Sequence, residues 1–312
     1  MDPRADFISS VEIDSTRVKS FRGFIFMCGG PHDIRQAAES VRSLLIREMT
    51  SGNHSGLAER IKLSEEIQDW FRDAAYSDLV LLEEHLASLS SMIILVVESE
   101  GAIAELGVFS SFRRFSDRMI TLIANENYEK DSFIRLGPIQ KLENLDIDSV
   151  LVYDWDGRDG LGRPIKRFSE IAGDIVETVA KIKGYLARPP SESVFRWDDP
   201  LHVMLLVCEL CDLFGALGLL ELEQYLEDLG AGISQRELKQ FLFLLERCNL
   251  ISPKATGNKR YFCAPNWTTH ISFGLGGKPV DRDRLRVDIF DYYRQNDQRR
   301  ASLIRNQVSR VG

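Results

Sequence analysis

Acidic and small polar residues that could do chemistry stand together at Glu98-Ser99-Glu100-Gly101, between an apolar run and a helical pattern. Glu105 follows one helical turn after Gly101, so its carboxylate would point back over the preceding strand end. A carboxylate in that place can attack the anomeric carbon of a ribosyl group, and its charge stabilises an oxocarbenium-like transition state. Ser99 and the main-chain N–H groups near Gly101 could hold sugar hydroxyls or a phosphate, with Glu98 as a further acid at the same edge.

The same residues also fit a purely structural interpretation. The helix dipole favours acids at the start of a helix, which would account for Glu98 and Glu100 without any ligand. Ser99 is a suitable N-cap in either case, although Ala102 stands where a capping box would carry Glu or Gln. Glu105 would then be an ordinary surface residue, and spacing alone leaves the two interpretations open.

The elements around this stretch predict where it would lie. The run 92–97 is short, β-branched and apolar throughout, which favours a strand buried on both faces of a parallel sheet. A second strand is predicted at 23–28, and Gly29-Gly30 after it form either a tight turn or a place where a ligand approaches the backbone closely. We therefore predict an α/β fold with a doubly wound parallel sheet, which binds ligands at the carboxyl ends of its strands. Further strands are expected at 118–124 and 150–153.

Helical patterns complete the first domain, which we assign to residues 1–188 with a polar lead-in over 1–20. Glu83 lies on a predicted helix at 77–89 that could present it to the same sheet edge. Neither GxGxxG nor GK[ST] follows the first strand, so we expect neither a dinucleotide fingerprint nor a P-loop. Helices are also expected at 34–49 and 167–186, short elements at 57–63 and 65–71, and a loop at 132–138.

A second domain begins after Pro189 and Pro190, because two prolines cannot continue the helix before them. Three helices followed by a hairpin are typical of a winged helix-turn-helix, which we assign to residues 194–268. Residues 269–312 form a charged helical tail with eight Arg and five Asp, which favours a solvated helix with one packed aromatic face. The helices are predicted at 201–214, 219–229 and 234–248, and the hairpin at 250–265.

Basic residues concentrate in the second half of the winged-helix pattern. Between Ser234 and Cys263, six basic residues stand against two acidic ones, whereas 196–233 holds eight acids and one base. Phosphate contacts would fall on the basic half, and a module that binds only protein is the alternative. The candidate nucleic-acid or partner contacts are Arg236, Lys239, Lys254, Lys259 and Arg260.

The composition is ordinary for a soluble protein. The 312 residues are 44% hydrophobic with a formal net charge of −8, which argues against a uniformly basic nucleic-acid coat. No apolar run approaches the roughly 20 residues that span a bilayer, and the N-terminus lacks a signal-peptide core, so we expect a cytoplasmic protein without membrane contact. Five cysteines are too few for a disulfide framework. Cys208 and Cys211 lie in an apolar helical stripe, which favours core thiols, and no metal site is expected.

These motifs resemble the nucleoside 2-deoxyribosyltransferase family, and more closely its divergent branch of retron-associated effector proteins, which are toxins. The resemblance rests on 24–30, 82–86 and 98–107, covers nearly the whole chain and is most specific around Glu105. Residues 132–138 and the winged-helix-like region also match that branch. The resemblance implies a flavodoxin-like fold and cleavage of an N-glycosidic bond, with Glu105 in the position of the nucleophile.

By motif position, Ser99 matches a serine that holds substrate, and Glu83 matches an acid that helps to bind base or sugar. The transferases often carry further Asp residues where this chain has Ser99 and Gly101, so the resemblance favours hydrolysis of a nucleotide or NAD over base exchange. NAD is the first choice because nicotinamide departs neutral, which suits a site without a conspicuous His acid. It would be a substrate, and no cofactor is expected. Cys28, Gly29 and Gly30 match the loop that lines the pocket.

The resemblance also implies partners. In that branch the effector is encoded with a reverse transcriptase and an RNA-linked multicopy single-stranded DNA, whose complex restrains the toxin until phage infection. The basic winged helix would contact that nucleic acid or the reverse transcriptase. The alternatives are a transcription regulator, in which the winged helix reads DNA and the α/β domain senses a nucleotide without catalysis, and a scaffold that forms a homo-oligomer or higher assembly through its tail.

Overall fold

The computed structural model describes residues 2–30, 40–54, 56–67, 75–188, 191–266, 268–277 and 280–308. The chain forms two compact units. The sheet unit comprises Arg22–Asp69 and Asp78–Pro189, and the helical unit comprises Met1–Phe21, Trp70–Ser77 and Pro190–Gly312. No helix among the described residues has the length and apolar character needed to cross a membrane.

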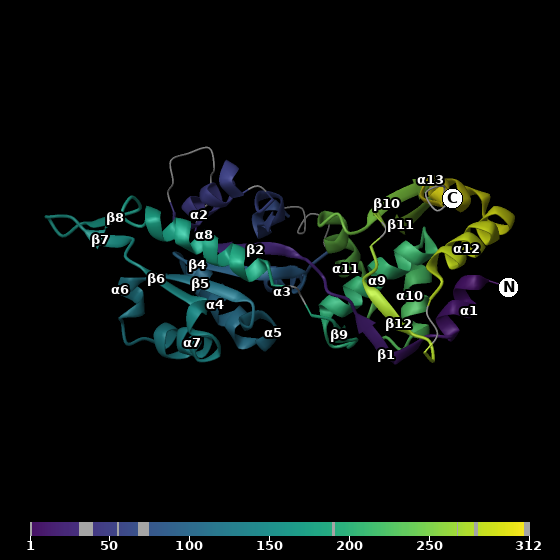
Figure 1. Ribbon diagram of the computed structural model, residues 1–312, viewed down its shortest axis with the longest axis horizontal. Coiled ribbons are helices and arrows are strands. Elements are labelled where there is room, and N and C mark those ends of the chain that lie inside the picture. The colour runs from purple at the N-terminus through teal and green to yellow at the C-terminus, as the bar shows by residue number, and fades with distance from the viewer. Residues whose placement is uncertain are drawn as a thin grey trace. The chain divides into compact units, whose positions relative to one another are not determined.

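The sheet unit is built on a five-stranded parallel sheet in the order β3-β2-β4-β5-β6 (Figure 1). This confirms the predicted α/β fold with a parallel sheet. Numbered along the chain, the strand order is 2-1-3-4-5, the flavodoxin-like order, and the chain reverses direction across the sheet between β2 and β4. The strands are β2 (Phe24–Gly29), β3 (Ile61–Lys62), β4 (Ser90–Val97), β5 (Met119–Ala124) and β6 (Val150–Tyr153).

Helices cover both faces of this sheet (Figure 1). On one face, α2 (Val41–Met49) and α8 (Ala172–Leu186) share a core with Ile25 and Met27 of β2. On the other face, Phe26 packs edge-on against Phe109 of α4 (Glu100–Ser111), with ring centroids 5.9 Å apart. Because side chains alternate along a strand, Cys28 shares the α4 face with Phe26. Two further helices of the sheet unit are α3 (Leu79–Ser88) and α5 (Arg113–Ser116).

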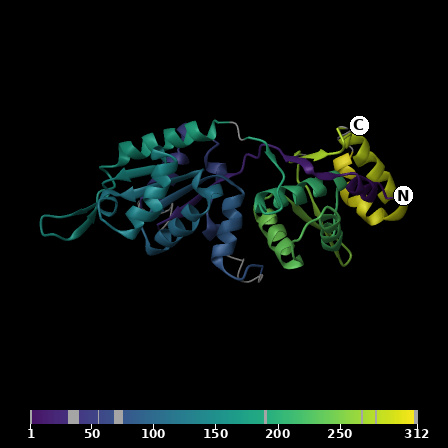
Figure 2. The same cartoon turned by 90° about the horizontal axis from the view of Figure 1, so that it is seen from below.

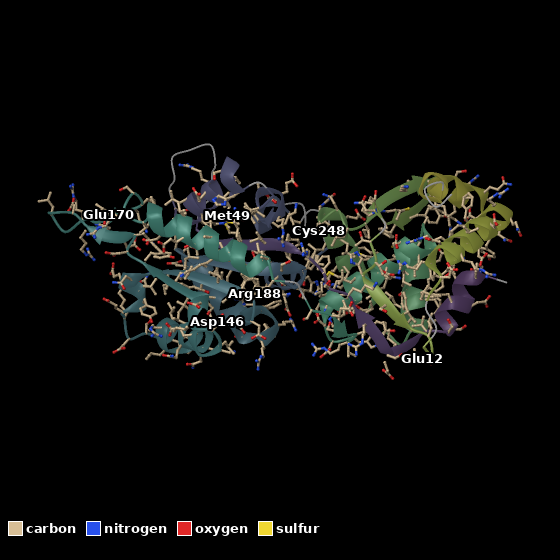
Figure 3. All side chains as sticks on the ribbon, viewed as in Figure 1. Glu12, Met49, Asp146, Glu170, Arg188 and Cys248 are labelled. Atoms are coloured by element: carbon tan, nitrogen blue, oxygen red, sulfur yellow. The ribbon has the colours of Figure 1, made fainter. Side chains whose placement is uncertain are left out.

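Shorter elements join these strands. The short element expected at 57–63 contains the edge strand β3, and the expected loop at 132–138 overlaps a π-helical turn at Arg135–Ile139. The helix predicted at 34–49 is described only over α2, since 31–39 lie outside the described residues, and of the element predicted at 65–71 only residues up to 67 are described. Figure 3 labels Met49 at the end of α2. The other elements are η1 (Gly52–His54), η2 (Ala58–Arg60), η3 (Ser64–Glu66), α6 (Asn125–Tyr128), α7 (Gln140–Leu145), η6 (Ile147–Ser149), β7 (Asp156–Arg158) and β8 (Pro164–Lys166).

The helical unit contains the predicted order of three helices and a hairpin (Figure 2). An isolated bridge between Leu217 and Phe262 ties the second strand of the hairpin to the segment before the second helix. Cys208 and Cys211 are buried free thiols, as expected of core cysteines. The winged-helix assignment itself stays a prediction. The elements are α9 (Pro200–Phe214), α10 (Leu219–Asp228), α11 (Gln235–Arg247), β10 (Ser252–Thr256) and β11 (Lys259–Cys263).

The prediction of a polar lead-in over 1–20 is wrong. These residues form α1 (Pro3–Ser9) and β1 (Glu12–Val18), and they belong to the helical unit rather than to the first domain. The strand β1 lies between β9 (Ser193–Val194) and β12 (Ile271–Gly274) in an antiparallel sheet. Both partners lie more than 170 residues later in the chain, so no local pattern near the N-terminus predicts the pairing.

The C-terminal region is also more than a solvated tail. The helices α12 (Arg282–Asn296) and α13 (Gln298–Val308) are part of the helical unit. The guanidinium of Arg286, which is buried, donates to Asp212 at 2.6 Å, and Tyr293 donates to the main-chain oxygen of Phe214 at 3.0 Å. The alternating charges therefore include ion pairs with buried acids of α9, and the expected packed aromatic face is present at Tyr293.

Candidate active site

The polar stretch that follows β4 lies at the carboxyl end of the sheet, beside the point where the strand order reverses. Ser99 is the N-cap of α4, because its Oγ accepts a hydrogen bond from the main-chain N–H of Ala102 at 3.2 Å. The Ser99 side chain is exposed, and its Oγ lies 3.8 Å from a Cβ built on Gly101. Among the described residues outside the helix backbone, no other atom comes within 4 Å of that Cβ, so these residues leave room beside the first turn of α4.

Glu105 lies one turn into α4 and is only partly exposed. Its Oε2 is buried and has no hydrogen-bond partner among the described residues. The pKa of Glu105 is raised to about 7: burial is the largest cause, the negative charges of Glu83 and Glu65 also raise it, and the positive charge of Arg42 opposes them. Glu105 is thus a half-buried carboxyl group that is ionised in part at neutral pH, which is unlike an ordinary surface glutamate.

Two other predicted site residues gather around Glu105. The side chain of Glu83 comes from α3 and is 7% exposed, and that of Cys28 comes from β2 and is 2% exposed. Burial, then Glu105 and Glu83, hold the pKa of the Cys28 thiol above its usual range, so Cys28 is a neutral neighbour of two acids. His85, also on α3, has its pKa lowered to about 4 by burial, so it is neutral at pH 7 and cannot act as a charged acid there.

The two glycines after β2 permit close packing of strand ends. Gly29 has φ +122°, and a Cβ on it would lie 2.3 Å from the main-chain oxygen of Val96. A Cβ on Gly30 would lie 2.7 Å from Oε2 of Glu98. Gly29 therefore requires glycine for the packing of β2 against the end of β4, whereas a side chain at Gly30 would displace the carboxylate of Glu98.

Glu98 has a structural role that differs from the one predicted for it. Its carboxylate accepts hydrogen bonds from the main-chain N–H groups of Val41 at 2.8 Å and Arg42 at 3.3 Å. It therefore caps the amino end of α2, which starts 57 residues earlier in the chain. There the carboxylate accepts hydrogen bonds from N–H groups that have no partner within the helix, and its negative charge interacts favourably with the helix dipole. Contact of Glu98 with substrate stays a prediction.

Sequence reasoning missed Arg42 and Glu65. The guanidinium of Arg42 is buried, and it donates to both carboxylate oxygens of Glu65, at 2.7 and 2.9 Å. One signal was available, because a cation in the first turn of a helix opposes the helix dipole and calls for a compensating partner. Nothing in the sequence identified that partner, since Glu65 lies 23 residues away in η3.

The basic residues of the helical unit are brought together only in part. Arg236, Lys239 and Arg260 line one groove of about 630 Å³, together with the half-buried ring of Phe243. Lys254 is turned elsewhere, with its ammonium donating to the main-chain oxygen of Leu303 at 3.1 Å. Lys259 is exposed beside the hairpin turn and is not among the residues that line the groove, and Arg260 also pairs with Glu246.

Among the described residues, no three His, Cys, Asp or Glu side chains are grouped so that they could hold a metal ion. The groups that surround Glu105 are carboxylates, one thiol and one guanidinium.

Comparison with known proteins gave two matches. A family model described as "STM3845 retron effector protein" matches residues 38–253, which is more than half of the chain. An Escherichia coli protein named "Retron Ec73 putative ribosyltransferase/DNA-binding protein" is 26% identical over 146 residues, which is 45% of this chain and 45% of that protein. The matched region thus spans less than half of that relative.

Proposed function

Since the chain belongs to the STM3845 retron effector protein family, we propose that this retron-associated defence effector cleaves an N-glycosidic bond of NAD or a nucleotide, with Glu105 as nucleophile. The observation that carries the proposal is the half-buried Glu105 carboxyl, whose Oε2 has no partner among the described residues, at the switch point of a flavodoxin-like sheet. The relative named as a ribosyltransferase supports chemistry at a ribosyl group.

The proposed reaction has two steps. An oxygen of the ionised Glu105 forms a bond with C1′, while the bond from C1′ to the base nitrogen breaks and its electron pair leaves with the base. Water then attacks C1′, which frees the sugar, restores the carboxylate and releases a proton. A pKa of about 7 leaves a large fraction of Glu105 ionised at neutral pH, so the nucleophilic form is available.

NAD is the preferred substrate because nicotinamide leaves as a neutral molecule and needs no proton. The described neighbours of Glu105 support this choice. Glu83 and Cys28 lie beside it, and the imidazole of His85, which lies on α3 with Glu83, has a pKa of about 4, so it is not protonated at pH 7. A purine or pyrimidine nucleotide requires a proton on its leaving base, and we propose Glu83, the buried acid beside Glu105, as its source.

The test is release of base by the purified chain, freed of its partners, from NAD and from a panel of nucleotides. We expect base release from the parent chain and a reduction of roughly a thousandfold or more in Glu105→Gln, which keeps the shape of the side chain but cannot act as a nucleophile. Glu100→Gln, an exposed acid on the same helix, is the matched control and should keep its activity. Equal rates for Glu105→Gln and the parent would contradict the assignment.

We also propose that the groove of the helical unit contacts the retron's own components, a reverse transcriptase with RNA-linked single-stranded DNA, and that this contact restrains the enzyme. Arg236, Lys239 and Arg260 supply positive charge, and Phe243 supplies an aromatic ring, a combination suited to single-stranded nucleic acid. The relative named as DNA-binding is compatible with this role. Tight, sequence-selective binding to duplex DNA without any base release would favour a transcription regulator instead.

A further inference from the structure

The side chain of Arg42 donates hydrogen bonds to several groups at once. It is 1% exposed, and its Nη1 donates to the main-chain oxygens of Gly29 at 3.2 Å and Gly30 at 3.0 Å. Its Nη2 donates to the main-chain oxygen of Met27 at 3.2 Å, and both nitrogens donate to Glu65. The guanidinium therefore holds the backbone at the carboxyl end of β2.

The main chain of Arg42 adds a third connection, because its N–H donates to Glu98 directly after β4. Glu65 lies in η3, directly after the edge strand β3. One residue thus links the carboxyl ends of β3, β2 and β4, the three strands that flank the switch point. Its planar fork suits this task, since it can donate to a carboxylate and to several carbonyl oxygens at fixed angles.

The same guanidinium lies among acids. The groups that act on Glu105 are Cys28 from β2, Arg42 from α2, Glu65 from η3 and Glu83 from α3, and Arg42 is the cation among them. Among the described residues, the other cations on elements that pack against α4 form ion pairs of their own: Arg113 and Arg114 of α5 with Asp117 and Glu84, and Arg135 of the π-helical turn with Glu143.

We infer that Arg42 is a positioning residue of the candidate site: its guanidinium fixes the backbone after β2 and supplies the positive charge that favours the carboxylate form of Glu105. This inference rests on the proposed function, in which that carboxylate is the nucleophile. Glu65 has two effects. It holds the guanidinium in place, and its own negative charge opposes ionisation of Glu105.

The two members of this ion pair therefore give opposite predictions. In Arg42→Met the opposing cation is removed, the pKa of Glu105 rises, and the acidic limb of the pH–rate profile moves to higher pH by roughly one unit. In Glu65→Gln a negative charge is removed while Arg42 remains, so the limb moves to lower pH. A role confined to holding the fold would lower the rate in both variants and leave the limb where it is in the parent chain.

Two further variants separate charge from shape. Arg42→Lys keeps the charge without the planar fork, so its acidic limb should stay close to the parent position while its rate falls. Arg60→Met is the matched control, because Arg60 donates to the main-chain oxygen of Gly23 at 3.0 Å and to Ser91 at 3.3 Å, at the amino ends of β2 and β4. It removes a comparable tie from the opposite edge of the sheet and should lower stability without moving the limb.

A direct titration keeps this test separate from the proposed function. The side-chain carboxyl of Glu105, labelled with 13C-glutamate and assigned by its absence in Glu105→Gln, can be followed by NMR without any substrate. We expect its pKa to rise in Arg42→Met and to fall in Glu65→Gln. An unmoved pKa in both variants overturns the inference even if base is released, whereas shifted pKa values with no base release from any substrate support the inference and contradict the proposed function.

Discussion

Holding the Glu105 carboxyl half-buried has an energetic consequence for the folded chain. Its pKa is raised to about 7 from an ordinary value of 4.5, so the folded state binds the proton more tightly than the unfolded state does. The stabilisation from this group is fully present below about pH 4.5 and disappears as the pH rises through about 7. At neutral pH the folded chain is therefore less stable than it would be with an uncharged side chain at this position. Functional residues often lower stability in this way.

Replacement of Glu105 by Gln should remove that pH dependence. We compare the free energy of unfolding of Glu105→Gln with that of the parent chain. We expect the difference in favour of the variant to be about 2 kcal/mol larger at pH 8 than at pH 5. Equilibrium urea unfolding followed by circular dichroism at both pH values measures the difference. Glu100→Gln removes an exposed carboxylate from the same helix and should show no such change between the two pH values. If the difference in unfolding free energy between Glu105→Gln and the parent chain does not increase from pH 5 to pH 8, Glu105 is not held in the half-buried state described above.

The sequence predicted single residues well where the reason for them was local. Ser99 is the expected N-cap, and the offset between Gly101 and Glu105 follows directly from helix geometry. Arg42 was missed because its partners come from other strand ends. Glu98 lies just before α4, and the sequence predicted that its charge would interact with the dipole of that helix, but its carboxylate caps α2 instead. Pairing across a sheet edge depends on the completed topology, which no local pattern contains.

At the scale of elements, the groove of the helical unit changes which basic residues should matter. The sequence predicted all five basic residues as contacts for nucleic acid or a partner. In the structure, the groove is lined by Arg236, Lys239 and Arg260, whereas Lys254 donates to the main-chain oxygen of Leu303 in α13. A lysine engaged with the end of a helix is less free to meet a phosphate. The structure therefore gives a sharper expectation than net charge does.

We expect Arg236→Gln combined with Lys239→Gln to weaken binding of a single-stranded DNA oligonucleotide. The slope of log K against log salt should fall by about 1.4, or about 0.7 for each phosphate that the variant no longer neutralises. Fluorescence anisotropy from about 50 to 200 mM salt measures this slope. Lys254→Gln is the matched control outside the groove and should leave the slope nearly unchanged. An equal reduction in both variants would place the nucleic-acid contact elsewhere on this unit.

Elements defined by a periodic apolar pattern were predicted, and those defined by distant pairing were not. The run 92–97 predicted the strand β4, and the patterns at 201–214 and 234–248 predicted the helices α9 and α11. The strand β1 alternates too weakly to be recognised, since it is mostly polar and only Thr16 and Val18 are buried. The two-residue strand β3 is too short for any periodicity, although it completes the edge beside β2.

At the scale of the whole molecule, the two units are interleaved along the chain. The helical unit takes its first segment from residues 1–21 and its largest from 190–312, and the sheet unit is encoded mainly between them. Arg4 of α1 donates to Glu221 of α10 at 2.7 Å and to Tyr293 of α12 at 3.0 Å, so the N-terminal segment joins parts that are far apart in sequence.

A chain that lacks residues 1–21 should therefore lose structure in the helical unit and keep the parallel sheet, because β9 and β12 are both deprived of their common partner β1. We expect much faster hydrogen exchange in α9 and α12 and little change in β4 and β5, measured by mass spectrometry. Arg4→Met, which removes ion pairs but leaves β1 in place, should show a much smaller effect. Unchanged protection of α9 in the truncated chain would show that β1 is dispensable.

The pairing of β1 with β12 also sets an order of events during synthesis. All strands of the parallel sheet and α8 have left the ribosome once Pro189 has emerged, whereas β1 must wait for Ile271–Gly274. At roughly 5–20 residues per second, that interval lasts about 4–17 s. The nascent chain therefore completes the unit that holds Glu105 before the unit proposed to restrain it. If the partner complex acts through the helical unit, each newly made chain passes through a brief interval in which its sheet unit is complete but the partner cannot yet restrain it. During that interval, the activity depends only on how many new chains are present.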